Sequence, residues 1–258
     1  MNNSSSPPGL IYGPVRSRRL GLSLGINLLP TPYKLCSFSC IYCQYRRVKK
    51  SRFVPANELK ILPKPEEVGA ALEAALLRLS GDGESVDSIA ICGNGEPTLY
   101  PDLRGVIDRV QRLRDQYLPQ ARLAILSNSS TVGNNTVRDA LKRLDLRIMK
   151  FDAGSEEMFR QLNHPVTPVY MGEIVAGLKE LTNTYLESLF LQGKVSNVDP
   201  DSVDVWVEKL REIQPLGVQI YTLDCVSPEQ RLEKVNLSTL QWIAEQVRWR
   251  TGLPAEVI

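Results

Sequence analysis

The feature that most constrains this chain is a repeated alternation of short apolar runs with segments of helical periodicity. Apolar residues recur three and four positions apart between Val68 and Leu79, which is typical of an amphipathic helix, whereas VDSIAIC at Val86–Cys92 is a short continuous run typical of a buried strand. The same reasoning predicts strands at Ser23–Leu29, Val86–Cys92, Ala121–Ser127, Leu146–Phe151, Leu186–Leu191 and Val218–Leu223. Helices are predicted at Val68–Leu79, Leu103–Leu118, Thr136–Leu144, Tyr170–Leu181, Val203–Ile213 and Leu237–Arg248.

Strands that are separated by helices form βαβ units, which give a parallel sheet with right-handed crossovers. About six such units predict an α/β fold, a partial (β/α)6 TIM-like barrel with parallel strands. The length of 258 residues fits this architecture. We expect residues 1–10 to be a disordered lead-in and residues 11–258 to form a single domain. In parallel α/β folds, functional side chains gather just past the C-terminal ends of the strands, so those positions are the first to inspect.

Composition excludes several classes of protein. The formal net charge of +2 does not indicate a nucleic-acid binder, and the hydrophobic content of 43% is ordinary for a globular chain. No apolar stretch has the roughly 18–20 residues that a membrane-spanning helix needs, and MNNSSSPPG has no apolar core of a secretory signal. We therefore expect a cytoplasmic protein without a membrane partner. Its five cysteines need a metal or redox explanation before a disulfide one.

Three of these cysteines form a C-x3-C-x2-C motif at Cys36, Cys40 and Cys43, soon after the first predicted strand. Thiolates are soft ligands that suit iron–sulfur clusters or zinc. Three close cysteines can hold three corners of a cubane and leave the fourth iron open, as a reactive site requires. Structural zinc would need a fourth ligand, and the only histidine, His164, is distant in sequence. A redox pair of Cys40 and Cys43 would leave Cys36 unexplained.

The motif with an aromatic residue, Tyr42, before its last cysteine resembles the signature of radical S-adenosylmethionine (SAM) enzymes. The resemblance implies that Cys36, Cys40 and Cys43 ligate a 4Fe–4S cluster whose free iron is chelated by SAM. It also implies reductive cleavage of SAM to methionine and a 5′-deoxyadenosyl radical, in which the cofactors supply the reactivity and the protein positions them. The expected domain at 11–258 is then a radical SAM domain.

A glycine-rich segment, Gly93-Asn94-Gly95-Glu96-Pro97-Thr98, follows the second predicted strand. Glycines let the backbone approach a ligand closely, and a carboxylate can accept a hydrogen bond from an ammonium group. The resemblance makes this segment the motif that holds the methionyl amino group of SAM. The alternative is an ordinary strand-to-helix turn that Pro97 opens.

Polar residues also follow the later strands. The resemblance implies that Ser127 and Asn128 contact the SAM ribose, although both types also serve as helix or turn caps. Lys150 and Asp152 end the next strand, and we expect them to face the site as catalytic residues, with Asp152 also contacting SAM; the alternative for Asp152 is an exposed turn. Gln192 stands where relatives carry a loop that supports adenine. We interpret Cys92 and Cys225 as small buried hydrophobic residues and not as metal ligands.

The opening segment at 12–30, with GNGEPTL, KFDAG and QIYTLD, is similar to a compact group of Fe–S oxidoreductases related to wyosine tRNA-base synthases. This implies an electron donor such as flavodoxin or ferredoxin and an unidentified substrate, with tRNA base modification one candidate. Peptide modification and activation of a glycyl-radical enzyme remain open. The basic run Arg46–Arg52 is either a solvated face or a docking site for such partners. The alternative from another class is a non-catalytic module that binds zinc or nucleic acid.

Overall fold

The computed structural model describes residues 9–43, 61–224 and 231–258. Its strands are β1 (Ile11–Ser17), β2 (Gly21–Ile26), β3 (Ser88–Ile91), β4 (Arg122–Ser127), β5 (Leu146–Lys150), β6 (Thr184–Leu189), β7 (Leu191–Gly193), β8 (Gly217–Tyr221), β9 (Leu232–Lys234) and β10 (Ala255–Val257). Its helices are α1 (Pro65–Gly81), α2 (Leu103–Tyr117), α3 (Asn135–Leu141), α4 (Glu156–Asn163), α5 (Met171–Lys179), α6 (Pro200–Ile213) and α7 (Leu237–Thr251), with a short 3-10 helix η2 (Pro97–Leu99).

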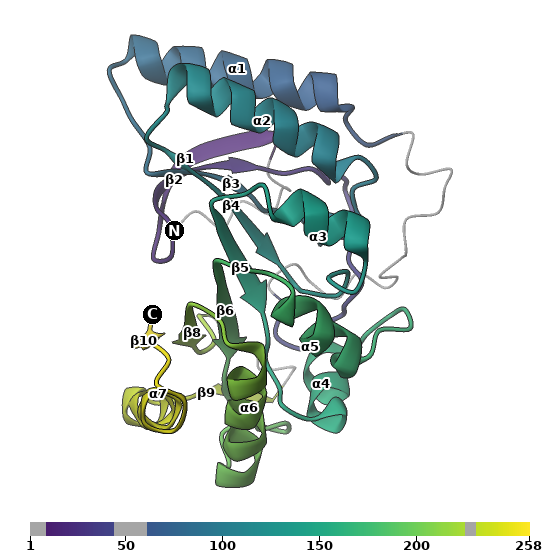
Figure 1. Ribbon diagram of the computed structural model, residues 1–258, viewed down its shortest axis with the longest axis vertical. Helices are drawn as coiled ribbons and strands as arrows, with labels where there is room; N and C mark the ends of the chain where they lie inside the picture. The colour runs from purple at the N-terminus through teal and green to yellow at the C-terminus, as the bar shows by residue number, and fades with distance from the viewer. Residues whose placement is uncertain (1–8, 44–60, 225–230) are drawn as a thin grey trace.

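The main sheet has eight strands in the order β1-β2-β3-β4-β5-β6-β8-β10. All neighbours from β2 to β10 pair in parallel, and β1 pairs antiparallel with β2. The strand order follows the chain, as successive βαβ units require. This confirms the predicted α/β fold with a mostly parallel, partial barrel. Figure 1 shows α1, α2 and α3 over the first strands and α4 to α7 beside the later ones.

Side-chain alternation divides the apolar residues between two cores, because successive residues of a strand point to opposite faces. On β4, Leu123 and Ile125 belong to the large core between sheet and helices, whereas Ala124 belongs to a small cluster on the other face. Leu146 and Ile148 of β5 also belong to that cluster, which fills the inside of the barrel. The inner face is therefore apolar at the start of the strands.

The turn between β1 and β2 links the first strands to the last ones. Leu20 of this turn packs in the inner cluster. The next residue back, Arg19, pairs with Glu187 of β6, and Arg18 pairs with Asp224 after β8 at 3.0 Å. Strand β1 was not predicted from the sequence. The turn that follows it contacts β6 and the segment after β8. These ion pairs connect the two ends of the parallel set.

The helices form where the apolar spacing predicts them, and their ends are set by capping groups. Asp102, Asn134 and Asp199 each accept a backbone N–H bond at the start of α2, α3 and α6. Helix α4 was not predicted, because it is only eight residues long. No helix in the described ranges is both long and apolar enough to cross a bilayer.

Candidate functional site

A cavity of about 350 Å³ opens at the C-terminal ends of the parallel strands. The cysteines of the C-x3-C-x2-C motif line it together with Glu96, Lys150 and Tyr221, so residues from the cysteine loop and from strand ends β3, β5 and β8 meet there. This is the end of the barrel at which parallel α/β proteins bind their ligands. The volume lies in the range of small-molecule sites, about 300–1,000 Å³.

The strands aim these side chains by their alternation. On β5, Leu146 and Ile148 face the inner cluster, and Lys150, two residues further, lines the cavity above them. On β4, Leu126 and then Asn128 follow the same face and both line the cavity. The inner face of each of these strands is thus apolar near its start and polar at its C-terminal end. The polar side chains of neighbouring strands therefore surround the same cavity.

The cysteine loop is fixed from two sides. Leu35 forms a parallel bridge with Gly95, and the Glu96 N–H donates to the Leu35 carbonyl at 2.8 Å. On the other side, the Ile41 N–H donates to the Leu162 carbonyl at the end of α4 at 2.9 Å. A Cβ atom at Gly95 would lie 1.9 Å from the Leu35 oxygen, and its φ of +125° is a glycine conformation. Glycine at 95 is therefore required for this close approach.

Each cysteine of the motif faces a nitrogen donor from a different segment. Lys34 Nζ lies 3.2 Å from Cys43 Sγ, and Asn128 Nδ2 lies 3.4 Å from Cys36 Sγ. Asn163 Nδ2, at the end of α4, lies 3.5 Å from Cys40 Sγ. Hydrogen bonds to cysteine sulfur stabilise the thiolate form that iron requires. This donor set fits a thiolate-bound cluster.

The pKa values of the cysteine thiols fit a site in which a bound metal would favour the thiolate form. Burial raises the pKa of Cys36 to about 12, with Cys40 and Glu96 adding to the effect and Lys34 opposing it. Burial likewise raises the pKa of Cys40. In the described part of the chain, no three Cys, His, Asp or Glu side chains gather as ligands of a single metal ion. The cysteines of a cubane instead bind separate irons at its corners.

Glu96 is a buried carboxylate that ties two strand ends together. Its Oε1 accepts from Thr98 N at 3.0 Å and from Ser127 Oγ at 2.8 Å, and its Oε2 accepts from Asn128 N at 2.6 Å. Burial raises the pKa of Glu96, although these donors favour its charged form. Glu96 therefore holds the ends of β3 and β4 in register while it lines the cavity.

Lys150 is the centre of a buried charge network. Its Nζ lies 3.5 Å from Asp152 Oδ1 and 3.4 Å from Glu187 Oε1, and it bonds the Tyr221 hydroxyl. Burial opposes the charge on Lys150, but Asp152, Tyr221 and Glu187 outweigh it and hold its pKa well above the ordinary value. Lys150 is thus a fixed ammonium on the cavity wall. The Tyr42 ring lies 5.2 Å from the same nitrogen.

Asp152 does not face the cavity as the sequence predicted. Its side chain is 0% exposed and is absent from the cavity lining. Its carboxylate accepts bonds from the Tyr42 hydroxyl, from Asn163 Nδ2 at 2.7 Å and from Leu189 N at 2.9 Å. Tyr42 and Lys150 line the cavity and Asp152 lies behind them, so its carboxylate holds these two side chains and Asn163 in place. The alternative of an exposed turn is equally excluded.

Three further predicted contacts lie away from the cavity. Asn94 is buried and donates to the Thr31 carbonyl at 2.9 Å, and Pro97 begins η2. Gln192 lies in β7, which pairs with β9. The cavity lining contains none of these three side chains, but it contains Tyr42, Gly93, Gly95, Glu96, Ser127, Asn128, Lys150 and the three cysteines.

Several residues of the site were missed by sequence reasoning. Lys34 stands two residues before the motif, and Asn163 is brought to it by α4. Glu187 lies inside an apolar strand, where a charge is itself a signal for a site or an ion pair. Cys92, interpreted as a small hydrophobic residue, lines the cavity and lies 2.9 Å from the Tyr12 hydroxyl.

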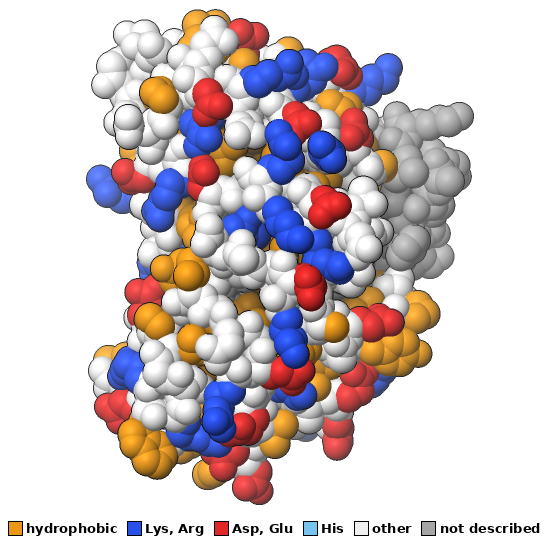
Figure 2. Space-filling model, viewed as in Figure 1, with side chains coloured by type: hydrophobic (Ala, Val, Ile, Leu, Met, Phe, Trp, Pro, Cys, Tyr) orange, Lys and Arg blue, Asp and Glu red, His pale blue; other side chains and the backbone are white. Residues whose placement is uncertain are grey.

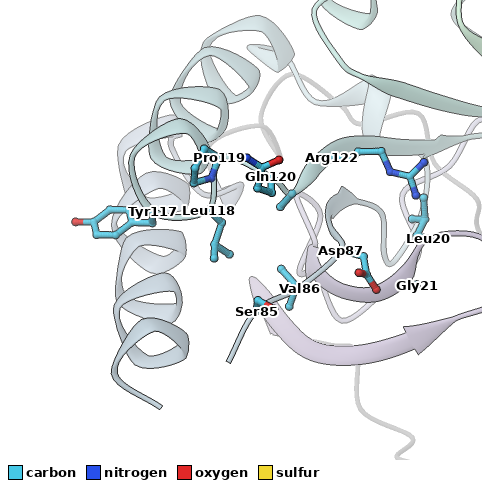
Figure 3. Close-up of a pocket in the computed structure, with 11 residues that line it drawn as sticks. Leu20, Gly21, Ser85, Val86, Asp87, Tyr117, Leu118, Pro119, Gln120 and Arg122 are labelled. Carbon is cyan, nitrogen blue, oxygen red and sulfur yellow. The ribbon is translucent and has the colours of Figure 1, made fainter. Parts of the chain in front are cut away.

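A second cavity, of about 540 Å³, lies at the opposite end of the barrel. Figure 3 shows Asp87, just before β3, and Gln120 and Arg122, just before and at the start of β4, around it. The Asp87 carboxylate already accepts the Leu22 N–H at 2.7 Å. Although it is larger, this cavity holds no cysteine, and the N-terminal end of a parallel barrel is where residues serve stability.

The face seen in Figure 2 carries Lys and Arg side chains beside Asp and Glu side chains. Among the described residues, Arg143 pairs with Asp108 at 2.6 Å and Arg109 pairs with Glu66 at 2.5 Å, so these opposite charges offset one another. The predicted lead-in up to residue 8, the basic run Arg46–Arg52 and Cys225 lie outside the described residues. Their predicted roles stay predictions.

Curated relatives match most of this chain. A UPF0026 protein of Helicobacter pylori is 30% identical over 222 residues, which cover 84% of this chain and 67% of that protein. The chain belongs to the UPF0026 family. A second UPF0026 protein, of Methanocaldococcus jannaschii, is 31% identical, with 80% of this chain and 61% of that protein covered. A GTPase Obg of Brachyspira hyodysenteriae is 30% identical over 88% of this chain but only 32% of its own length.

The UPF0026 chain thus spans less than two thirds of these last two relatives. No family model matches it. Among solved structures, a radical SAM methyltransferase from Sphaerobacter thermophilus superposes with a TM-score of 0.68 at 16% identity, covering 92% of this chain and 65% of that one. TYW1 with a lysine-pyruvate adduct bound gives 0.60 at 16% identity, with 89% and 74% covered. Streptococcus suis SuiB bound to S-adenosylmethionine gives 0.61 at 15%, with 88% and 49% covered. The fold is therefore that of radical SAM proteins.

Proposed function

We propose that this UPF0026 protein is a radical SAM enzyme that binds a 4Fe–4S cluster through Cys36, Cys40 and Cys43. The observation that carries the proposal is the cavity at the strand ends, where three thiols share one wall and each faces its own nitrogen donor. The structural neighbours support it, because they include a radical SAM methyltransferase, the radical SAM enzyme HemN of Escherichia coli and a SuiB structure that holds S-adenosylmethionine. When bound, the cluster supplies the electron that cleaves SAM to methionine and a 5′-deoxyadenosyl radical.

The residues around the cavity divide the remaining tasks. Gly93, Gly95 and Glu96 line the side next to the cysteine loop and present backbone and carboxylate groups to the methionyl end of SAM. Ser127 and Asn128 line the next strand end, where they face the ribose. Lys150 and Tyr221 lie further along the cavity wall, where the Lys150 ammonium group and the Tyr221 hydroxyl face the substrate. Asp152 orients Lys150 and Tyr42.

The candidate substrates follow from the sequence resemblance and from the structural neighbours. The sequence resemblance to wyosine tRNA-base synthases keeps a tRNA base as a candidate, and the structural neighbour SuiB bound to a precursor peptide keeps a peptide as another. A neighbour from the pyruvate-formate lyase-activating enzymes keeps activation of a glycyl-radical enzyme as another. A flavodoxin or ferredoxin is the proposed electron donor. A non-catalytic zinc module is disfavoured because, in the described residues, no three Cys, His, Asp or Glu side chains gather as ligands of a single metal ion.

The test is reductive cleavage of SAM by protein that is purified and reconstituted without oxygen. We expect about four irons per chain and release of 5′-deoxyadenosine when dithionite is added. Cys36→Ala, Cys40→Ala and Cys43→Ala should each lose both iron and product, because each removes one ligand. Cys92→Ala is the matched control, since Cys92 lines the same cavity outside the motif, and it should keep its iron. Iron loss in Cys92→Ala with retention in Cys36→Ala would refute the ligand assignment.

A further inference from the structure

Lys34 is a buried cation that the sequence motif does not include. Its side chain is only 6% exposed, although it carries an ammonium group. Nζ donates to the Phe38 carbonyl at 3.1 Å and to Cys43 Sγ at 3.2 Å. Lysine is almost never buried without a partner, because desolvation of the charge is costly. No carboxylate forms a salt bridge with Lys34 within the part of the chain that the structure describes.

The negative partner that Lys34 lacks is supplied by the thiolate loop. Lys34 Nζ lies 3.2 Å from Cys43 Sγ, and iron binds cysteine as a thiolate, so a bound cluster would place negative charge beside this ammonium group. The other two side-chain donors to the motif's sulfurs, Asn128 and Asn163, are neutral amides. Within the described residues, Lys34 is therefore the one charged side chain that donates to these sulfurs.

We propose that Lys34 is a positioning residue that sets the reduction potential of the bound cluster and helps to hold it. This rests on the proposed function. A cluster with three thiolate ligands becomes more negative by one charge when it accepts an electron. A fixed positive charge beside one ligand stabilises that reduced state more than the oxidised state, and the effect is large because the site is buried. Lys34 thus makes the first electron transfer from the donor more favourable.

The experiment measures the midpoint potential of the reconstituted cluster by an EPR-monitored redox titration without SAM. Lys34→Gln keeps a donor for the Phe38 carbonyl but removes the charge, and Lys34→Met removes both. In both variants we expect the reduction equilibrium to become at least tenfold less favourable, which is about 59 mV for one electron. Lys34→Arg should stay close to wild type. Lys142→Met, on the exposed end of α3, is the control for removing a distant lysine.

The outcomes separate this inference from the proposed function. A wild-type protein that takes up no cluster refutes both. Clusters with unchanged potentials in Lys34→Gln and Lys34→Met refute the role of Lys34 alone, as does an equal fall in Lys34→Arg. If the two neutral variants take up no iron and Lys34→Arg does, the cation is needed to hold the cluster, which supports the inference. If all three variants take up none, shape rather than charge is required and the inference fails.

Discussion

At the residue scale, the site depends on a few buried polar side chains that act through one another. Asp152 is the clearest case, because its carboxylate joins Tyr42, Asn163 and Lys150 while it remains outside the cavity. Asn163 in turn faces Cys40, so the chain of contacts runs from the charged wall of the cavity to a proposed cluster ligand. A change at Asp152 should therefore affect both stability and cluster binding.

We predict that Asp152→Ala lowers the free energy of unfolding by about 3–5 kcal/mol, since it removes a buried carboxylate that the buried Lys150 ammonium and Asn163 amide share as a partner. Denaturant unfolding at neutral pH measures this. Asp224→Ala is the matched control: it also removes an aspartate from an ion pair, but its side chain is 53% exposed, so the loss should not exceed about 1 kcal/mol. Equal effects of the two changes would mean that the network around Asp152 is not buried.

Sequence reasoning identified which residues gather near the site more accurately than it identified which of them line the cavity. Glu96, Asn128 and Lys150 line the cavity because each stands at or just after a strand end, and the cysteines line it from the loop that follows β2. Asp152 also stands at a strand end, but it follows Lys150 by two residues, beyond β5, where the backbone has left the strand and alternation no longer fixes direction. Lys34 and Asn163 belong to no recognisable sequence motif. They reach the cysteine sulfurs only through the folding of the cysteine loop and of α4.

At the scale of elements, the cysteine loop is an insertion held between the end of β3 and the end of α4. The predicted strands and most helices are present because strong apolar periodicity fixes them. The elements β1, β7, β9, β10 and α4 were missed; β7, β9 and β10 have three residues each, which is too few to show a period. The second support of the cysteine loop was therefore hidden from sequence reasoning.

Gly95→Ala tests the first support of this loop. A methyl group there would meet the Leu35 oxygen, and the φ of +125° would be strained, so we predict a loss of about 1–3 kcal/mol in unfolding free energy. Reconstituted iron should fall with it, because Leu35 precedes the first ligand. At Gly172, the added Cβ atom would meet no non-neighbouring atom within 4 Å. In Gly172→Ala the free energy of unfolding should therefore stay the same or rise by about 0.5–1 kcal/mol. A fully stable, iron-loaded Gly95→Ala protein would contradict the close approach.

At the scale of the whole molecule, the turn between β1 and β2 joins the two sides of the partial barrel through charge. Arg19 and Lys150 both pair with Glu187, and the Arg19 guanidinium lies 4.7 Å from the centre of the Tyr221 ring. Burial raises the pKa of Glu187, but Lys150 and Arg19 outweigh burial and hold its pKa below the ordinary value. The stability of the barrel should therefore depend on this carboxylate being charged.

A carboxyl group whose pKa is lower in the folded state binds fewer protons there than in the unfolded chain. Its contribution is fully present above the unfolded pKa of about 4.3 and is lost as the pH falls through the folded value. We predict that acid lowers the unfolding free energy of wild type more steeply below about pH 4.5 than that of Glu187→Gln. Glu245→Gln, an exposed change on α7, should follow wild type. Parallel pH curves for wild type and Glu187→Gln would contradict the pairing.

The central claim is that three cysteines hold a cluster with one iron open to SAM, and an EPR spectrum tests it most directly. The wild-type protein is reconstituted, reduced with dithionite and measured with and without SAM. We predict the signal of a reduced 4Fe–4S cluster whose g values change when SAM is added, because SAM then coordinates the open iron. A cluster signal that SAM leaves unchanged, or a reconstituted protein without any cluster signal, would contradict the account.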